Sequence, residues 1–193
     1  MKVGGGAAKG SEFERRMMKQ FSLWWSGGTR DDVFWRTAGS GARATARGRR
    51  ALRTAGHYGD LTATDELGQP FVNRAVVEFK TGYGREPWDV LTLLELDDKI
   101  GTHQLTRFWE QACAEAVAAG DGRTPLLVFR RMRSLSPLMM MRFELAYKVC
   151  DSAAWSHALV WRTHHAPFAP AVVLLPLAMF FLHSDPAQWA RSV

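Results

Sequence analysis

The order of hydrophobic and polar residues predicts an amphipathic helix near the start of the chain. In the segment SEFERRMMKQFSLWW, apolar side chains recur at the three- and four-residue spacing of one helical face: Phe13, Met17, Phe21 and Trp24. Ser11 is a favourable N-cap for this helix. After the helix-breaking segment GGTRDD, the segment DVFWRTAGS predicts a short strand with Val33 and Trp35 on one face.

Two further strands are predicted in the middle of the chain. The segments HYGDLTATDE and FVNRAVVEFK have strand patterns and are separated by LGQP, where Gly68 and Pro70 predict a turn. The preceding residues 39–56 are rich in Gly, Ala and Arg and have no apolar period, so we interpret them as an extended loop.

Helices and strands alternate in the rest of the chain. EPWDVLTLLEL predicts a helix, and THQLTRFWEQACAEAVAAG predicts a stronger one, capped by Thr102 and ended by Gly120. The apolar run in TPLLVFRR is typical of a strand covered on both faces. LMMMRFELAYKV fits a strand or a helix, SHALVWR predicts a strand, AVVLLPLAMFFL predicts a buried strand followed by a short helix, and PAQWARS predicts a terminal helix.

This order predicts an α/β fold with a central mixed β-sheet flanked by helices. The length of 193 residues allows one domain with a proper core, and 47% hydrophobic with 23% charged residues is ordinary for a soluble globular protein. We expect a smaller C-terminal α/β extension, residues 133–193, packed on the core.

Net charge indicates the class of binding partner, and the cysteine content indicates the cellular compartment. The formal net charge of +6 favours a polyanionic partner, nucleic acid before an anionic membrane surface. Cys113 and Cys150 are the two cysteines, without the spacing of a zinc site, which fits a reducing cytoplasm. The N-terminus lacks the apolar core of a signal peptide, and the longest apolar run is too short to span a membrane.

The strand RAVVEFKTG contains a candidate reactive site. Glu78 and Lys80 share one face of this strand, where their burial costs several kcal/mol unless they are paired. A hairpin with the preceding strand would bring Asp60 beside Glu78. Two carboxylates with a nearby lysine predict a Mg²⁺ or Mn²⁺ site for phosphodiester hydrolysis. The alternative is a structural Glu–Lys pair at an exposed strand tip.

These residues resemble a known motif. Gly59-Asp60 followed by Glu78-Phe79-Lys80 is similar to the PD-(D/E)XK nuclease motif, with Gly59 where proline often stands. KGSEFERRMMKQF and WRTAGSGA resemble the first helix and the strand-loop of archaeal-type Holliday junction resolvases, and similar stretches occur in phage- and prophage-encoded proteins. The resemblance covers residues 9–132.

The resemblance implies a restriction-endonuclease-like fold and roles for several residues. Asp60 and Glu78 correspond to metal ligands, with the backbone carbonyl of Phe79 as a further ligand, and Lys80 corresponds to the catalytic lysine. Glu14 corresponds to the third acid, in preference to Glu12. Alternatively, Ser11 and Glu14 form a capping box, in which Glu14 only binds a backbone N–H.

Further roles are implied near the ends of these segments. Ser40 would hold a phosphate or influence the metal site, and Arg36 would contact the nucleic-acid backbone. The alternative for both residues is an ordinary turn without a functional role. Gln111 would face the site from the following helix. Gln104 competes for that role, and either glutamine equally fits a solvated helix position.

The loop at residues 42–56 is predicted to bind DNA. It has no acidic residue to balance its arginines, which are Arg43, Arg47, Arg49, Arg50 and Arg53. The guanidinium group suits phosphate because it donates two parallel hydrogen bonds. Without aromatic residues for base stacking, the loop favours backbone contacts over sequence readout. A solvated basic loop is the alternative.

The leading interpretation is a magnesium- or manganese-dependent DNA endonuclease that acts on branched or junction DNA in phage or prophage recombination or DNA processing. The resemblance also implies a homodimer. The basic loop and the residues from 133 onward depart from compact archaeal resolvases, so flaps, forks and plain duplex stay open as substrates. The rival interpretations are a DNA-binding protein that does not cleave and a structural or assembly protein.

Overall fold

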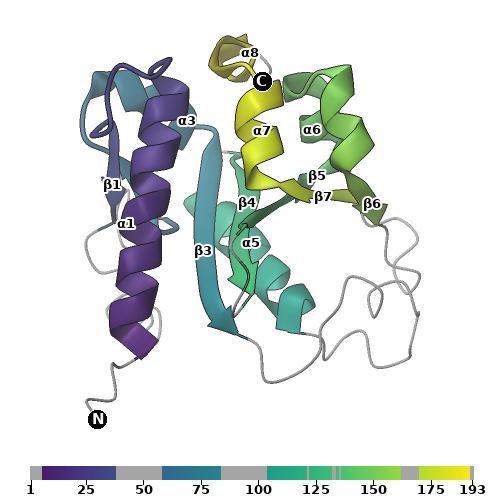
Figure 1. Cartoon of the computed structure of the whole chain (residues 1–193), viewed down its shortest axis with the longest axis horizontal. Coiled ribbons are helices and arrows are strands. Elements are labelled where there is room, and N and C mark those ends of the chain that lie inside the picture. Colours follow the sequence, from purple (N-terminus) through teal and green to yellow (C-terminus); the bar gives the residue numbers. More distant parts are fainter. Residues whose placement is uncertain are drawn as a thin grey trace.

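The computed structural model describes residues 6–37, 58–83, 104–120, 122–131, 134, 136–161 and 170–191. The principal strands of these segments form a five-stranded mixed sheet with helices on both faces (Figure 1). The predicted α/β class with a central mixed sheet is therefore confirmed. No helix in these segments is long and apolar enough to cross a membrane.

The sheet has the strand order β3-β4-β5-β7-β6, in which β3 and β4 are parallel and every other neighbouring pair is antiparallel. The bounds of its strands are β3 (Ala75–Tyr83), β4 (Thr124–Arg131), β5 (Leu138–Arg142), β6 (Leu159–Trp161) and β7 (Val172–Pro176). A separate antiparallel pair is formed by β1 (Phe34–Arg36) and β2 (Leu61–Ala63).

The helices cover the sheet in two layers (Figure 1). α1, α6, α7 and α8 pack on one face through the larger hydrophobic cluster, and α5 packs on the other face through a smaller one. The helical elements are α1 (Gly6–Trp25), η1 (Glu66–Gly68), α3 (Gln69–Val72), α5 (Gln104–Ala119), α6 (Phe143–Val149), η3 (Ser152–His157), α7 (Leu177–His183) and α8 (Pro186–Arg191).

An aromatic cluster joins the first helix to the last two. The ring of Trp24 lies 5.0 Å from that of Phe180 and 6.3 Å from that of Trp189. Its indole N–H donates a hydrogen bond of 3.0 Å to the carbonyl of Ser184, so the polar edge of this ring is satisfied. These contacts fix α1, which carries Glu14, against α7 and α8.

The sheet continues across residue 133, where the sequence predicts the start of a C-terminal extension. β5, whose Leu138–Arg142 follow this point, pairs with β4 through Leu126↔Met141 to Phe129↔Leu138. The apolar run of β4 alternates between the two layers, as predicted for a strand covered on both faces.

Several local predictions are confirmed. Gly120 follows α5 with φ +78°, a conformation that favours glycine and ends the helix. The run AVVLLPLAMFFL forms β7 followed by α7. LMMMRFELAYKV, which left strand and helix open, contains both, because β5 leads directly into α6.

Other local predictions are wrong. Val33 is fully buried whereas Trp35 is 49% exposed, so they do not share a face; β1 buries Phe34 instead. LGQP is not a hairpin turn, because it lies within η1 and α3, and β2 pairs with β1 rather than with β3. The predicted helix EPWDVLTLLEL, its neighbour Thr102 and the loop 42–56 lie outside the described residues.

Candidate active site

The polar end of β3 lies under α5. Glu78 and Lys80 share the strand face toward this helix, as the alternation of side chains predicts, and their side chains are 5% and 14% exposed. The Lys80 ammonium lies 2.5 Å from Glu78 Oε1 and 5.5 Å from the centre of the Phe108 ring. The pair is therefore largely buried rather than displayed at an exposed strand tip.

Asp60 meets β3 through the backbone. The Asp60 N–H donates to the carbonyl of Val77 at 2.8 Å, and the Phe79 N–H donates to Asp60 Oδ2 at 2.8 Å. These two bonds hold the carboxylate of Asp60 beside β3 at the level of Glu78. The predicted proximity is thus present, although it arises from this local bridge and not from the predicted hairpin.

Gly59 makes this approach sterically possible. It has φ +71°, and a Cβ at this position would lie 2.6 Å from the carbonyl oxygen of Val77. A side chain would therefore strain the local backbone and also push the segment away from β3. The substitution of glycine for the proline common in the motif has a physical reason in this chain.

Two residues of α5 connect the acidic segments. The Gln111 amide donates to Glu78 Oε1 at 2.8 Å and to Glu115 Oε1 at 3.2 Å. Glu115 Oε2 in turn accepts a hydrogen bond of 2.9 Å from the Gly59 N–H. Gln111 and Glu115 therefore link Glu78 with the segment that carries Asp60.

Sequence reasoning missed Glu115. It is four residues after Gln111 and so lies on the same helix face, a spacing that was available as a signal. Gln104, the competing glutamine at the start of α5, forms no hydrogen bond with Asp60 or Glu78 within the described residues. The contacts thus favour Gln111 over Gln104 as the polar residue that faces the site.

Glu14 reaches the site from α1 but is paired with arginine. Glu14 Oε2 lies 2.5 Å from Arg36 Nε, and Arg36 Nη1 donates to Ser11 Oγ at 2.7 Å. α1 begins at Gly6, so Ser11 lies inside the helix, and both the predicted N-cap and the capping box are wrong. The charge of Glu14 contributes to raising the pKa of Asp60, which indicates that the two carboxylates interact.

The two central carboxylates are protonated more easily than usual. Burial is the largest cause for both: it raises the pKa of Asp60 to about 6 and, together with the charges of Asp60 and Glu115, raises the pKa of Glu78 to about 8. The charge of Lys80 lowers both pKa values but is outweighed. With both carboxyls ionised, the site would therefore hold more negative charge than Lys80 balances.

This donor set fits a hard divalent cation, because added positive charge would offset the cost of ionising both carboxylates. Asp60 and Glu78 are the neighbouring oxygen donors. Among the described residues, however, no three His, Cys, Asp or Glu side chains gather closely enough to hold a metal. The predicted meeting of Glu14 with Asp60 and Glu78 around one ion is therefore not seen, and Glu14 contacts Arg36 instead.

The remaining predicted site residues fall outside the described segments. These are Ser40 and the loop arginines Arg43, Arg47, Arg49, Arg50 and Arg53. Their proposed contacts with phosphate stay predictions.

A comparison with protein families identifies the chain. The sequence model of the family described as "Phage putative PDDEXK endonuclease" matches residues 6–166. The chain belongs to this family. The PDDEXK assignment confirms the predicted superfamily, and the match includes α1, Asp60 and β3 through β6. The narrower resemblance to Holliday junction resolvases stays a prediction. No curated protein and no solved structure matches the chain.

Proposed function

We propose that this PDDEXK protein is a metal-dependent endonuclease that hydrolyses DNA phosphodiester bonds. The observation that carries the proposal is the buried meeting of Asp60 and Glu78 beside Lys80, with the pKa of both carboxyls raised. A structural Glu–Lys pair does not need a second carboxylate of unbalanced charge. The family assignment supports a nuclease independently.

Asp60 and Glu78 would hold the ion, which we propose to be Mg²⁺ or Mn²⁺, with the Phe79 carbonyl and Glu14 as further ligands. The bound ion would supply a Lewis acid for a phosphoryl oxygen and a more acidic water. Glu14 has to leave Arg36 to serve as a ligand, and the freed guanidinium would then be available to a DNA phosphate. On binding of metal and DNA, Glu14 would thus become a metal ligand and Arg36 would contact a phosphate.

Lys80 would act on the reacting phosphate. Its ammonium is held between Glu78 and the Phe108 ring, so its position is fixed before substrate arrives. From there it would orient the attacking water or stabilise the negative charge that develops on the phosphoryl oxygens. Gln111 and Glu115 would keep Glu78 and the Gly59-Asp60 segment in register.

The proposed substrate is DNA inside a phage-infected or prophage-bearing cell. We expect DNA to be bound mainly through its backbone, by Arg36, Ser40 and the arginines of the 42–56 loop, consistent with the net charge of +6. We further propose selectivity for branched or junction DNA, action as a homodimer, and a role in phage or prophage recombination or DNA processing in the host cytoplasm.

Nicking of supercoiled plasmid in Mg²⁺ tests the central claim. We expect cleavage by the wild-type protein and its loss in Asp60→Asn, which keeps the size of the side chain but removes its charge. Asp65→Asn is the matched control, because Asp65 pairs with Arg30 on the surface. Equal cleavage by wild type and Asp60→Asn would contradict the proposal.

Two outcomes separate the alternatives. DNA binding without any cleavage, in either metal, favours the protein that binds DNA but does not cut it. A panel of four-way junction, flap, fork and linear duplex of equal length then tests selectivity. Equal rates on all four substrates would exclude a preference for branched DNA while leaving the nuclease activity intact.

A further inference from the structure

Two arginines converge on one aromatic ring at the side of α1. The guanidinium carbon of Arg130, on β4, lies 4.9 Å from the centre of the Phe13 ring, and that of Arg16 lies 5.8 Å from the same centre. The Phe13 side chain is 2% exposed and packs edge-on against Phe79, with ring centroids 6.4 Å apart. Both guanidinium groups therefore make cation–π contacts with the same buried ring.

Within the described residues, neither guanidinium forms an ion pair or a side-chain hydrogen bond. Arg130 is partly buried, while Arg16 is exposed. Burial, and then the charge of Arg16, lower the pKa of Arg130, and the charge of Glu12 opposes them more weakly. Two like charges held together in this way favour an anion between them.

The pair lies close to the candidate active site along both elements that carry it. Phe13 precedes Glu14 on α1, and Arg130 pairs across the sheet with Thr81, the residue after Lys80. Because neighbouring strand residues face opposite ways, Arg130 lies on the α1 face while Lys80 lies on the α5 face. β3 and β4 end beside the N-terminal half of α1 (Figure 1), so Arg130 and Lys80 lie at the same end of the sheet, on opposite faces.

We propose that Arg16 and Arg130 form a binding subsite for one backbone phosphate of the DNA, on the flank of α1 away from Glu14. The inference rests on the proposed action on DNA. From Glu78 to Thr81, β3 advances roughly 10 Å, which corresponds to about three steps of one DNA strand along the duplex axis. The subsite would therefore hold the strand a few nucleotides from the phosphate that is cut.

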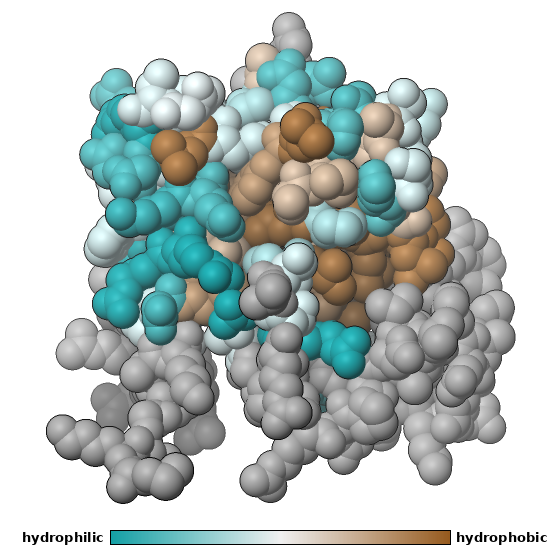
Figure 2. Space-filling model, viewed as in Figure 1, coloured by the Kyte–Doolittle hydropathy of each residue, from teal (hydrophilic) through white to brown (hydrophobic). Residues whose placement is uncertain are grey.

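Phosphate is the anion that fits because the site presents two planar guanidinium groups beside one ring. A guanidinium presents two parallel N–H donors to phosphate oxygens, and stacking on Phe13 leaves its edge available for them. The surface over α1 is hydrophilic, in contrast to the apolar surface beside α7, so a strand could lie along it (Figure 2).

The test measures binding of a labelled duplex in an Asp60→Asn background without divalent metal, so that cleavage does not interfere. The variants are Arg16→Gln, Arg130→Gln and both together. Arg15→Gln and Arg131→Gln are matched controls, because each removes one charge from the neighbouring residue of the same element. Dissociation constants are measured from low to moderate salt, and thermal melting checks folding.

We expect each single subsite variant to weaken binding about threefold to tenfold more than its control, and the double variant to reduce the salt slope by ~0.9, the value for one lost phosphate contact. Because both arginines bind the same phosphate, the double variant should lose less than the product of the single losses. Arg130→Lys should keep the salt slope but recover only part of the affinity, since it lacks the guanidinium fork.

Binding and salt slopes equal to those of the controls would overturn the subsite. A melting temperature lowered by Arg130→Gln with unchanged DNA affinity would likewise overturn it, by showing that Arg130 only covers the core. The plasmid assay decides the nuclease proposal separately: cleavage by the wild type with control-like binding by the variants leaves the nuclease standing without this subsite. Absence of any DNA binding at low salt in this metal-free background would overturn the subsite, while plasmid cleavage in Mg²⁺ would still decide the nuclease proposal.

Discussion

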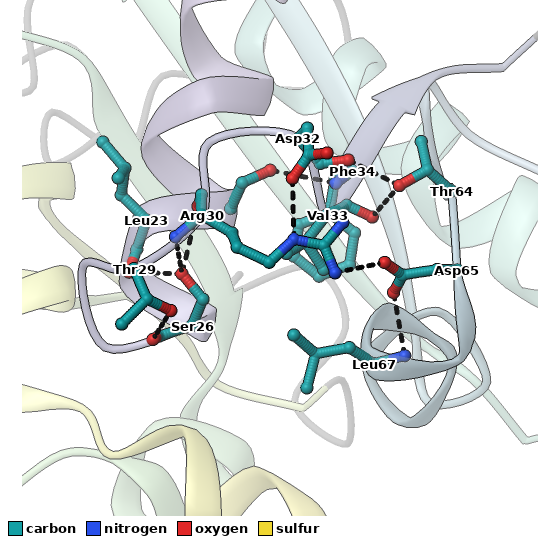
Figure 3. Close-up of polar contacts among 11 residues, drawn as sticks. Leu23, Ser26, Thr29, Arg30, Asp32, Val33, Phe34, Thr64, Asp65 and Leu67 are labelled. Atoms are coloured by element: carbon teal, nitrogen blue, oxygen red, sulfur yellow. Dashed lines mark hydrogen bonds and ion pairs between the residues drawn. The ribbon is translucent and has the colours of Figure 1, made fainter.

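Two polar networks in this protein contain similar residues, but carboxyl pKa values shift in opposite directions in the two. On the surface, Arg30 pairs with Asp32 at 2.8 Å and with Asp65 at 2.5 Å, and the Leu67 N–H donates to Asp65 (Figure 3). This network ties the segment after α1 to η1. In the candidate site, Asp60 and Glu78 meet beside the single ammonium of Lys80.

The pKa shifts separate the two networks. The hydrogen bond from Arg30 lowers the pKa of Asp32, and the hydrogen bonds to both aspartates raise the pKa of Arg30. In the site, burial raises the pKa of Asp60 and of Glu78 instead. The charge of Glu115 raises both pKa values further, and the charge of Asp60 adds to the shift of Glu78. Both networks hold two carboxylates for one cation. In the first, solvent hydrates the excess negative charge, whereas burial in the second favours the uptake of a proton or a cation.

The largest expected effect comes from removing the ammonium of the site. Lys80→Met should lower the single-turnover rate of DNA cleavage by about a hundredfold to a thousandfold, because it removes a positive charge aimed at the reacting phosphate. DNA affinity should change little. Lys19→Met is the control, since Lys19 pairs with Asp31 on the surface and should leave cleavage unchanged. Equal losses in both variants would show that the position of Lys80 in the site does not account for its effect on cleavage.

The second effect concerns stability and pH. The pKa of Glu78 rises from 4.5 to about 8 on folding, so the unfolded chain loses this proton first and metal-free stability falls as the pH rises through that range. Glu78→Gln should therefore raise the free energy of unfolding at pH 8 by on the order of 3 kcal/mol, with no gain at pH 4. Urea unfolding with a chelator present measures both values.

Asp32→Asn should change the free energy of unfolding at pH 8 in the opposite direction. Because folding lowers the pKa of Asp32, its charge stabilises the protein above its usual pKa of 3.8, and this contribution disappears as the pH falls through the folded value. The substitution should thus lower stability at pH 8 and have no effect at the lowest pH. A shift of the same sign for Glu78→Gln and Asp32→Asn would contradict the contrast between the networks.

A smaller loss is expected from Gly59→Ala. The added Cβ would meet the Val77 carbonyl oxygen, and the positive φ adds strain, so we expect about 2 to 3 kcal/mol of destabilisation together with impaired cleavage. Gly27→Ala is matched for backbone conformation, with φ +62°, but its Cβ would meet no atom within 4 Å. Thermal unfolding should show the greater loss at Gly59. Equal losses of stability in the two variants would mean that the close approach of Gly59 to β3 does not contribute to the destabilisation.

The smallest effect is expected at Glu115. Glu115→Gln keeps an oxygen that can accept the Gly59 N–H but removes a charge that acts on both carboxyls, so cleavage should fall about tenfold with a changed dependence on Mg²⁺ concentration. Glu115→Ala should fall further because the acceptor is lost as well. Glu110→Gln, an exposed position of α5, is the control. Unchanged metal dependence would limit Glu115 to a structural role.

Local patterns determined most of the elements from the sequence. The three- and four-residue spacing of Phe13, Met17 and Phe21 predicted the buried face of α1, and the apolar run of β4 predicted a strand with both faces covered. The alternation of a strand also placed Glu78 and Lys80 on one face. These features follow from the periods of helix and strand, which neighbouring residues set by themselves.

The tertiary structure decided how distant segments meet. It brought Asp60 to β3 through two backbone hydrogen bonds, it added Glu115 through the packing of α5, and it paired Glu14 with Arg36. The motif in the sequence predicted Asp60 and Glu78 as site residues, but it did not predict the hydrogen bonds that hold Asp60 beside β3. Such contacts depend on backbone direction and on packing between layers, which no local period of side chains encodes.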